Sequence, residues 1–192
     1  MVSQIKVNEI IKQSGSSITI GESGDTISIP TGATLSVSGS ASGLPDNTPA
    51  FHIRKSSNQT GITSGGWTKI TFDDEVYDTD SAFASDKFTA PSAGKYFFTA
   101  SAKINDNGGD HDLVGSGMRL YVNGSVATSI VHFMNNNPSL AEGKTITGVL
   151  NLSANDYVEA YVYAQDGAGG TCSITGGNDR DTFFMGFKLT GG

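Results

Sequence analysis

The chain has 192 residues, of which 36% are hydrophobic and 16% are charged, and its formal net charge is -7. An acidic surface argues against nucleic acid and against anionic membranes as partners. No apolar run approaches the ~18 residues that a membrane-spanning helix needs, and residues 1–13 lack the apolar run of a signal peptide, so we expect no membrane insertion and no export signal.

Glycine is abundant, with 25 copies, and it occurs beside many Ser, Thr and Asn residues. This composition favours turns and strands over helices. Cys172 is the single cysteine, which excludes a disulfide within the chain. We expect it to be a small buried or loop residue rather than a reactive thiol, because no base is visible near it.

Residues 1–43 carry a short repeating pattern. Three apolar–polar–apolar triplets, at 18–20, 27–29 and 35–37, recur every eight or nine residues with glycines between them. Each triplet has the period of a half-buried strand but is too short to bury its own face, so neighbouring chains must cover it. We expect a short β-stem over 1–43, formed by three chains, although a linker with accidental alternation is the alternative. Turn residues over 44–48 predict a hinge.

Strand patterns follow one another closely from residue 49 to residue 192. Asn123-Gly124 is the strongest hairpin signal between them. Tyr96, Phe98, Ala100 and Ala102 alternate with polar neighbours and predict one inward face. We therefore expect an all-β domain, a jelly-roll β-sandwich without helices. The expected strands are 50–54, 67–72, 87–90, 95–104, 118–122, 126–133, 145–152, 157–164 and 182–189.

Six short blocks in this domain stand in a distinctive order. They are Ala50-Phe51 with Arg54; Phe72-Asp73; Phe88-Thr89-Ala90-Pro91 with Gly94 and Tyr96-Phe97-Phe98; Asn123-Gly124; Leu150, Leu152 and Asp156 with Val158; and Phe183, Gly186-Phe187 and Leu189. In order and spacing these blocks resemble the globular head of the complement C1q family, which shares its jelly roll with tumour necrosis factor (TNF) ligands. The resemblance implies a homotrimer in which aromatic side chains fill each sandwich and the three-fold seam. The collagen stalk of animal members is absent here, and the β-stem would take its place.

The segment from Ile5 to Gly39 is similar to the N-terminal segments of tail-fibre and other virion proteins of marine bacteriophages. The two resemblances together imply a bacteriophage virion structural protein, made in the host cytoplasm. It would be a trimeric fibre or adhesin that contacts other virion proteins through its stem, while the head binds a host-surface glycan or protein multivalently. A capsid decoration or head-fibre protein is one alternative, and a cellular C1q-like lectin module is another.

No catalytic motif is present in the sequence. It contains neither a Gly-x-Ser-x-Gly elbow nor a phosphate-binding loop, and its three histidines lack the spacing of zinc ligands. We therefore expect no enzyme activity, no catalytic residues and no cofactor. Trp67 is expected to be a buried aromatic residue near the start of a strand, with a sugar-stacking platform as the alternative.

Two polar loops are the candidate binding elements. The loop 105–113 contains Asp106, Asp110 and Asp112, whose oxygens would suit calcium, although solvated acidic turns are the favoured alternative. The loop 165–181 is long and rich in Gly, Asn and Asp, and a jelly roll with both termini at its base places this loop at the far end. The ligand-binding residues predicted there are Asp166, Thr171, Asn178, Asp179 and Arg180, and a loop tip without a ligand is the alternative.

Overall fold

The computed structural model describes residues 10–11, 15, 17–38, 47–109, 111–134, 138–177 and 181–189. Its contacts divide the chain into two units, Met1–Leu44 and Pro45–Gly192. The described residues form 13 strands and no helix, so none of them lies in a helix long and apolar enough to cross a membrane. The expected all-β class is confirmed.

The described residues of the first unit are extended segments joined by turns. The backbone N–H of Asp25 donates to the carbonyl of Glu22 at 3.0 Å, and that of Ala33 donates to Pro30 at 3.0 Å. Residues 17–38 of the single chain form no strand. Their six apolar side chains are 46 to 66% exposed. The three-chain β-stem therefore stays a prediction.

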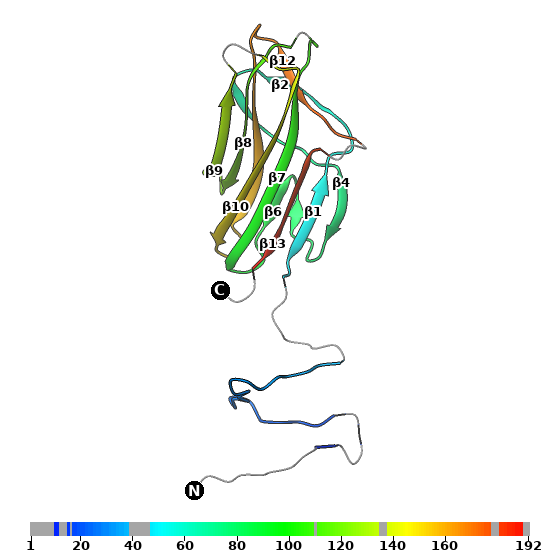
Figure 1. Cartoon of the computed structure of the whole chain (residues 1–192), viewed down its shortest axis with the longest axis vertical. Coiled ribbons are helices and arrows are strands. Elements are labelled where there is room, and N and C mark those ends of the chain that lie inside the picture. The colour runs from blue at the N-terminus through cyan, green and yellow to red at the C-terminus, as the bar shows by residue number, and fades with distance from the viewer. Residues whose placement is uncertain are drawn as a thin grey trace. The chain divides into compact units, whose positions relative to one another are not determined.

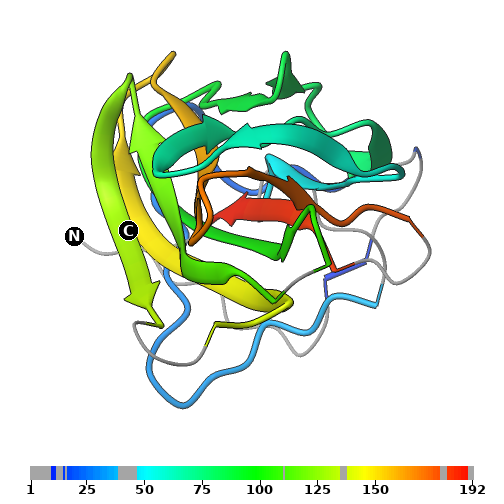
Figure 2. The same cartoon turned by 90° about the horizontal axis from the view of Figure 1, so that it is seen from above.

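The second unit, which we call the head, consists of two antiparallel sheets (Figure 1; Figure 2). Sheet A has seven strands in the order β2-β12-β7-β13-β1-β4, with β10 also paired to β7. Its strands are β1 (Ala50–Arg54), β2 (Gln59–Thr63), β4 (Asp74–Asp78), β7 (Gly94–Asp106), β10 (Ala141–Leu152), β12 (Thr171–Ile174) and β13 (Phe183–Lys188).

Sheet B has six strands in the order β5-β6-β11-β8-β9, with β3 also paired to β11. Its strands are β3 (Gly66–Lys69), β5 (Phe83–Ala84), β6 (Lys87–Thr89), β8 (Leu113–Val122), β9 (Ser125–Phe133) and β11 (Tyr157–Asp166). The strands β8 and β9 are joined by Asn123 and Gly124, both with positive φ, as the hairpin signal predicts.

The start of β1 and the end of β13 lie at one end of the head, because Ala50 pairs with Phe187. The strands β2 and β12 lie at the opposite end, which we call the distal end (Figure 1). The short strand β12 falls inside the segment 165–181, so the expectation of one long loop there is wrong. Cys172 and Ile174 are buried, and β12 pairs with both β2 and β7, which ties this part of the loop into sheet A.

Aromatic rings fill the core near the chain ends of the head. The Phe51 ring stacks on Phe88 with centroids 5.0 Å apart and meets Phe184 edge-on at 5.0 Å. Along β7 the inward side chains begin with Tyr96 and Phe98, both fully buried. Ala100, Ala102 and Ile104 follow, and the distal end of the strand carries Asp106. The inward face predicted for this strand is confirmed, and its last position introduces a buried carboxylate.

Candidate functional site

The loop after β7 and the loop after β11 lie side by side at the distal end. The Gly167 N–H donates to the carbonyl of Asp112 at 2.7 Å, and Asn107 Nδ2 donates to Thr171 Oγ1 at 3.3 Å. Asn107, Asp112, Asp166 and Thr171 line a hollow of about 380 Å³ between the loops. The structure therefore brings the predicted ligand residues Asp166 and Thr171 together with a residue predicted for calcium.

The carboxylate of Asp166 organises the loop that follows it. Its Oδ1 accepts hydrogen bonds from the backbone N–H groups of Ala168 at 2.9 Å and Gly170 at 2.8 Å. The Asp166 backbone is held in turn by Ser64, whose hydroxyl accepts from the Asp166 N–H and lies 3.2 Å from its carbonyl. Asp166 is buried, and its carboxylate serves as an acceptor for the turn, while its role as a ligand-binding residue stays a prediction.

Asp106 has the same role in the neighbouring loop. Its Oδ1 accepts from the Gly109 N–H at 2.8 Å and its Oδ2 accepts from the Asp112 N–H at 3.0 Å. In the part of the chain that the structure describes, no three His, Cys, Asp or Glu side chains gather closely enough to hold a metal ion. Asp110 lies outside the described residues, so the calcium site stays a prediction. The remaining predicted ligand residues, Asn178, Asp179 and Arg180, also lie outside them.

Cys172 is buried between these two acidic turns. Burial, followed by the negative charges of Asp166 and Asp106, raises the pKa of the Cys172 thiol to about 11. The sulfur therefore stays protonated at neutral pH and is a packed side chain rather than a nucleophile. The expected small buried residue is confirmed by its full burial.

The outward side of sheet A carries apolar side chains across five strands. The Phe97 ring lies 5.4 Å from the Phe187 ring, and Phe97 pairs on its other side with Val149, which is 57% exposed. His52 lies between the Tyr77 ring at 6.0 Å and the Phe183 ring at 5.8 Å. We call this surface the apolar face; it consists of His52, Tyr77, Phe97, Val149, Phe183, Met185 and Phe187.

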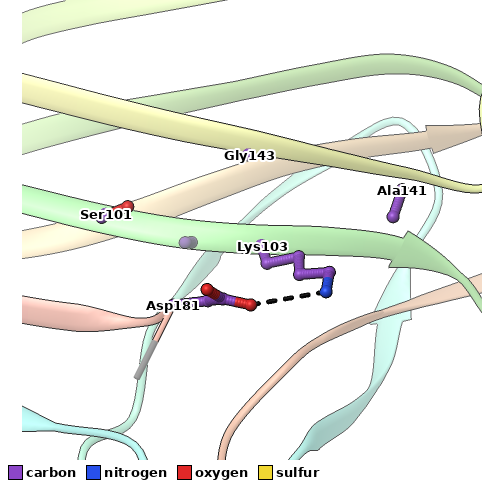
Figure 3. Close-up of a pocket in the computed structure, with 6 residues that line it drawn as sticks. Ser101, Lys103, Ala141, Gly143 and Asp181 are labelled. Atoms are coloured by element: carbon purple, nitrogen blue, oxygen red, sulfur yellow. Dashed lines mark ion pairs between the residues drawn. The ribbon is translucent and has the colours of Figure 1, made fainter. Parts of the chain in front are cut away.

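A polar hollow of about 330 Å³ adjoins the apolar face. It is lined by Ser101 and Lys103 of β7, by Ala141 and Gly143 of β10, and by Asp181. Figure 3 shows Lys103 and Asp181 facing each other across it, with Nζ and Oδ2 3.4 Å apart. Both charges are paired, so the hollow borders the apolar face with a neutral polar rim.

A second apolar surface lies along one edge of the sandwich. The strands β9 and β10 end their sheets on the same side of the head, where the described residues pair them only with β8 and β7. Val126, Ile130 and Leu140 are 43 to 49% exposed there. We call these residues and the two free strand edges the apolar edge. An unpaired strand edge with exposed apolar residues favours contact with another chain.

Trp67 is not buried as expected, because it lies on the outward side of sheet B. It pairs with Tyr163 of β11, whose neighbours Val162 and Ala164 point inward and are fully buried. The sequence pattern of β3 did not predict the outward position of Trp67, because the strand has only four residues, all of intermediate exposure, without alternation. The outward surface is indicated by β11, where tyrosines alternate with small residues.

No protein-family model and no curated protein matches the chain. Solved structures do match it. The globular domain of zebrafish complement 1qA protein aligns with 76% of this chain and 100% of its own, with a TM-score of 0.52 and 19% identity. The head has the C1q- and TNF-like jelly-roll fold.

Murine APRIL has the same fold in two further structures. Its pH 8.5 crystal structure aligns with 73% of this chain and 98% of its own, with a TM-score of 0.51 and 12% identity. Its pH 5.0 structure gives a TM-score of 0.52 and 14% identity with the same coverage. The jelly roll expected from the sequence is confirmed, and identities this low establish the fold alone.

Proposed function

We propose that the chain is a non-catalytic binding protein that works as a homotrimer. The observation that carries this proposal is the presence of two unlike exposed apolar surfaces on one head, the apolar face and the apolar edge. Monomeric proteins rarely leave extended apolar patches in water. Two different surfaces on one chain allow a head-to-tail contact, in which the apolar face of one copy packs against the apolar edge of the next. Such a contact forms a closed ring when the rotation between copies brings the last copy back to the first.

Two observations support three copies. The sequence blocks that resemble the C1q family imply a homotrimer with an aromatic seam, and the apolar face supplies aromatic residues at the surface. The exposed apolar triplets of residues 17–38 need further chains to cover them, as a three-chain stem would do.

We further infer that the protein is a bacteriophage virion component, a fibre or adhesin with its stem toward the particle. The similarity of the stem sequence to virion proteins supports this role. The fold of the head supports a cellular C1q-like module equally well. Antibody labelling of purified particles separates the alternatives: few copies at the tail indicate a fibre, many copies over the capsid indicate a decoration protein, and no label indicates a cellular module.

The trimer and its role in attachment are tested by one substitution. Val149→Asp places a charge at an exposed position of the apolar face, and Thr60→Asp adds the same charge to an exposed position of β2 as the control. We expect Val149→Asp alone to lower the mass seen by light scattering and to weaken attachment of labelled protein to host cells by tenfold or more, because avidity is lost (~10²-fold or more for linked sites). Unchanged mass, or equally tight attachment by the dissociated chain, would contradict the proposal.

A further inference from the structure

The outward side of sheet B carries a group of packed aromatic rings with a cation over one of them. Trp67 of β3 lies 5.4 Å from Tyr163 of β11, and the Arg119 guanidinium of β8 lies 3.9 Å from the centre of the Trp67 ring. Tyr161 continues the group along β11, with its ring 4.5 Å from Tyr121. These residues pair across strands in register, so they form one continuous surface.

Two more aromatic residues extend this surface in both directions. Phe133 of β9 is 52% exposed and lies 5.8 Å from Tyr163, and at the other end Lys87 Nζ lies 4.7 Å from the centre of the Tyr157 ring. We call the six aromatic residues the aromatic strip: Trp67, Tyr121, Phe133, Tyr157, Tyr161 and Tyr163. It spans four strands and shares no residue with the apolar face, and it meets the apolar edge only at Phe133 of β9.

Neighbouring side chains close over two glycines of β8 within the strip: a Cβ at Gly115 would lie 3.1 Å from Phe133, and one at Gly117 would lie 3.1 Å from Val131. Gly117 stands opposite Tyr163 and Gly115 stands opposite Gln165, so two successive outward positions of β8 carry no side chain. The bulky residues of β11 point outward while its alanines and valines point into the core. Burial alone would favour the reverse arrangement, because aromatic side chains gain most from leaving water.

The strip is locally basic on an acidic protein. Its charged neighbours are Arg119, Lys69, Lys87 and Glu159, and Lys69 is paired to Glu159 at 2.8 Å. In the described residues, the polar partners of Arg119 are the hydroxyls of Ser129 and Tyr121, which are uncharged. Among the described residues, neither Arg119 nor Lys87 forms an ion pair with a carboxylate. Both therefore present positive charge beside the rings, while the whole chain has a net charge of -7.

The phenol of Tyr161 adds no negative charge to this surface at neutral pH. Burial, followed by the charges of Glu159, Tyr121 and Tyr157, raises its pKa above the ordinary value.

We propose that the aromatic strip binds an acidic polysaccharide. The apolar faces of sugar rings would pack against the exposed tyrosines and against the part of Trp67 that Arg119 leaves uncovered. Carboxylate or sulfate groups on the polysaccharide would pair with Arg119 and Lys87. The planar fork of Arg119 suits either group. This inference rests on the proposed function in one respect, because it names the ligand class of a binding module; three strips on a trimer would add avidity.

Nucleic acid also offers stacking bases and negative charge, but its phosphate is separated from each base by a sugar. In an acidic polysaccharide the charged group is attached to the ring that stacks, which matches a surface where Arg119 and Lys87 lie directly against the aromatic rings. The observations therefore favour the polysaccharide.

The first experiment uses the full chain with immobilised polygalacturonate, dextran sulfate, neutral dextran and single-stranded oligothymidylate. We expect binding to polygalacturonate or dextran sulfate that weakens as salt is added, and the better of the two identifies the acidic group. Tighter binding to neutral dextran or to the oligonucleotide than to both acidic polymers would overturn the proposal, as would the absence of binding to both.

Matched variants then locate the site. Arg119→Gln should weaken binding about tenfold, since a charge-assisted hydrogen bond and its stacked cation are lost. Lys95→Gln removes the same charge from an exposed position on β7 in the other sheet and should change binding less than about twofold, because distant charges are screened. Trp67→Ala should also weaken binding, with circular dichroism to confirm its fold. An equal loss in Arg119→Gln and Lys95→Gln would overturn the assignment.

The outcomes keep this inference separate from the oligomeric state. A monomer that binds dextran sulfate through Arg119 supports the strip and contradicts the trimer. A trimer that binds neither acidic polymer contradicts the strip alone.

Discussion

Replacing Asp166 by Ala should destabilise the head, because the Asp166 carboxylate supports the turn after β11 from a buried position. The substitution removes two hydrogen bonds, from Ala168 at 2.9 Å and Gly170 at 2.8 Å. Each hydrogen bond to a charged group contributes ~1.5–3 kcal/mol to stability. Because the exposed backbone N–H groups of the loop can bond to water in the variant, we expect the two lost bonds to lower the free energy of unfolding by about 2–4 kcal/mol in total. Asp166→Asn keeps one acceptor oxygen and should lose about half as much.

Urea unfolding at one fixed protein concentration measures this effect. With a slope of about 2 kcal/mol per molar urea, the midpoint of Asp166→Ala should fall by roughly 1–2 M. Thr171→Ala, which removes only the exposed contact with Asn107, is the control and should shift the midpoint by less than about 0.3 M. An unchanged midpoint for Asp166→Ala would refute a structural role for this carboxylate and would favour its use in ligand binding.

Three further predictions concern the core, the thiol and the acid limit. Phe184→Ala, at a fully buried ring packed against Phe51, should lower the free energy of unfolding by about 3–5 kcal/mol; a loss below 1 kcal/mol in urea titration would contradict the packing. Cys172, with a pKa of about 11, should react with a disulfide reagent at pH 8 only after unfolding, and rapid labelling of the native chain would contradict its burial. The pKa of Asp156 is lowered by a hydrogen bond from the Asn123 side chain and then by one from a backbone N–H. The stability that the ionised Asp156 contributes is therefore complete above the ordinary carboxyl pKa of about 3.9, and it is lost as the pH falls through the lowered pKa. In Asp156→Asn the melting temperature should therefore decrease less steeply below pH 4 than in the original chain. An equally steep decrease in both would show that Asp156 does not contribute to the acid limit.

The long strands of the head follow directly from sequence alternation. Tyr96, Phe98, Ala100 and Ala102 alternate over a strand long enough to be recognised, and all four are fully buried in the structure. The signal at Asn123-Gly124 is equally local, since a two-residue hairpin turn requires positive φ at both positions.

The short strands could not be predicted in the same way. The strand β12 has two inward apolar residues, Cys172 and Ile174, and its burial depends on β2 and β7, which lie far from it in sequence. The strand β4 carries Asp74, Glu75 and Asp78 and reads as a polar turn. Its pairing with β1 makes it a strand, and a single-sequence pattern contains no information on that pairing.

The candidate sites also combine features that the local sequence predicts with features that depend on long-range pairing. The sequence analysis assigned Asp106 and Asp166 to two separate loops. Long-range pairing brings these loops together, since Asp106 pairs with Cys172 and Asp166 pairs with Leu113. The aromatic strip had a signal in sequence, because Tyr157, Tyr161 and Tyr163 share one parity along β11. The sequence alone does not show which of the two alternating sets along β11 faces the core, because this depends on how sheet A packs on sheet B. In the structure the tyrosines face outward.

The central claim, that this jelly roll assembles through its own apolar surfaces into a trimeric binding module, is tested most directly by the solution mass of the full chain. Light scattering across a range of concentrations should give three times the chain mass of 19.9 kDa. A mass of one chain at every concentration would contradict the apolar face, the apolar edge and the three-chain stem as contacts between copies.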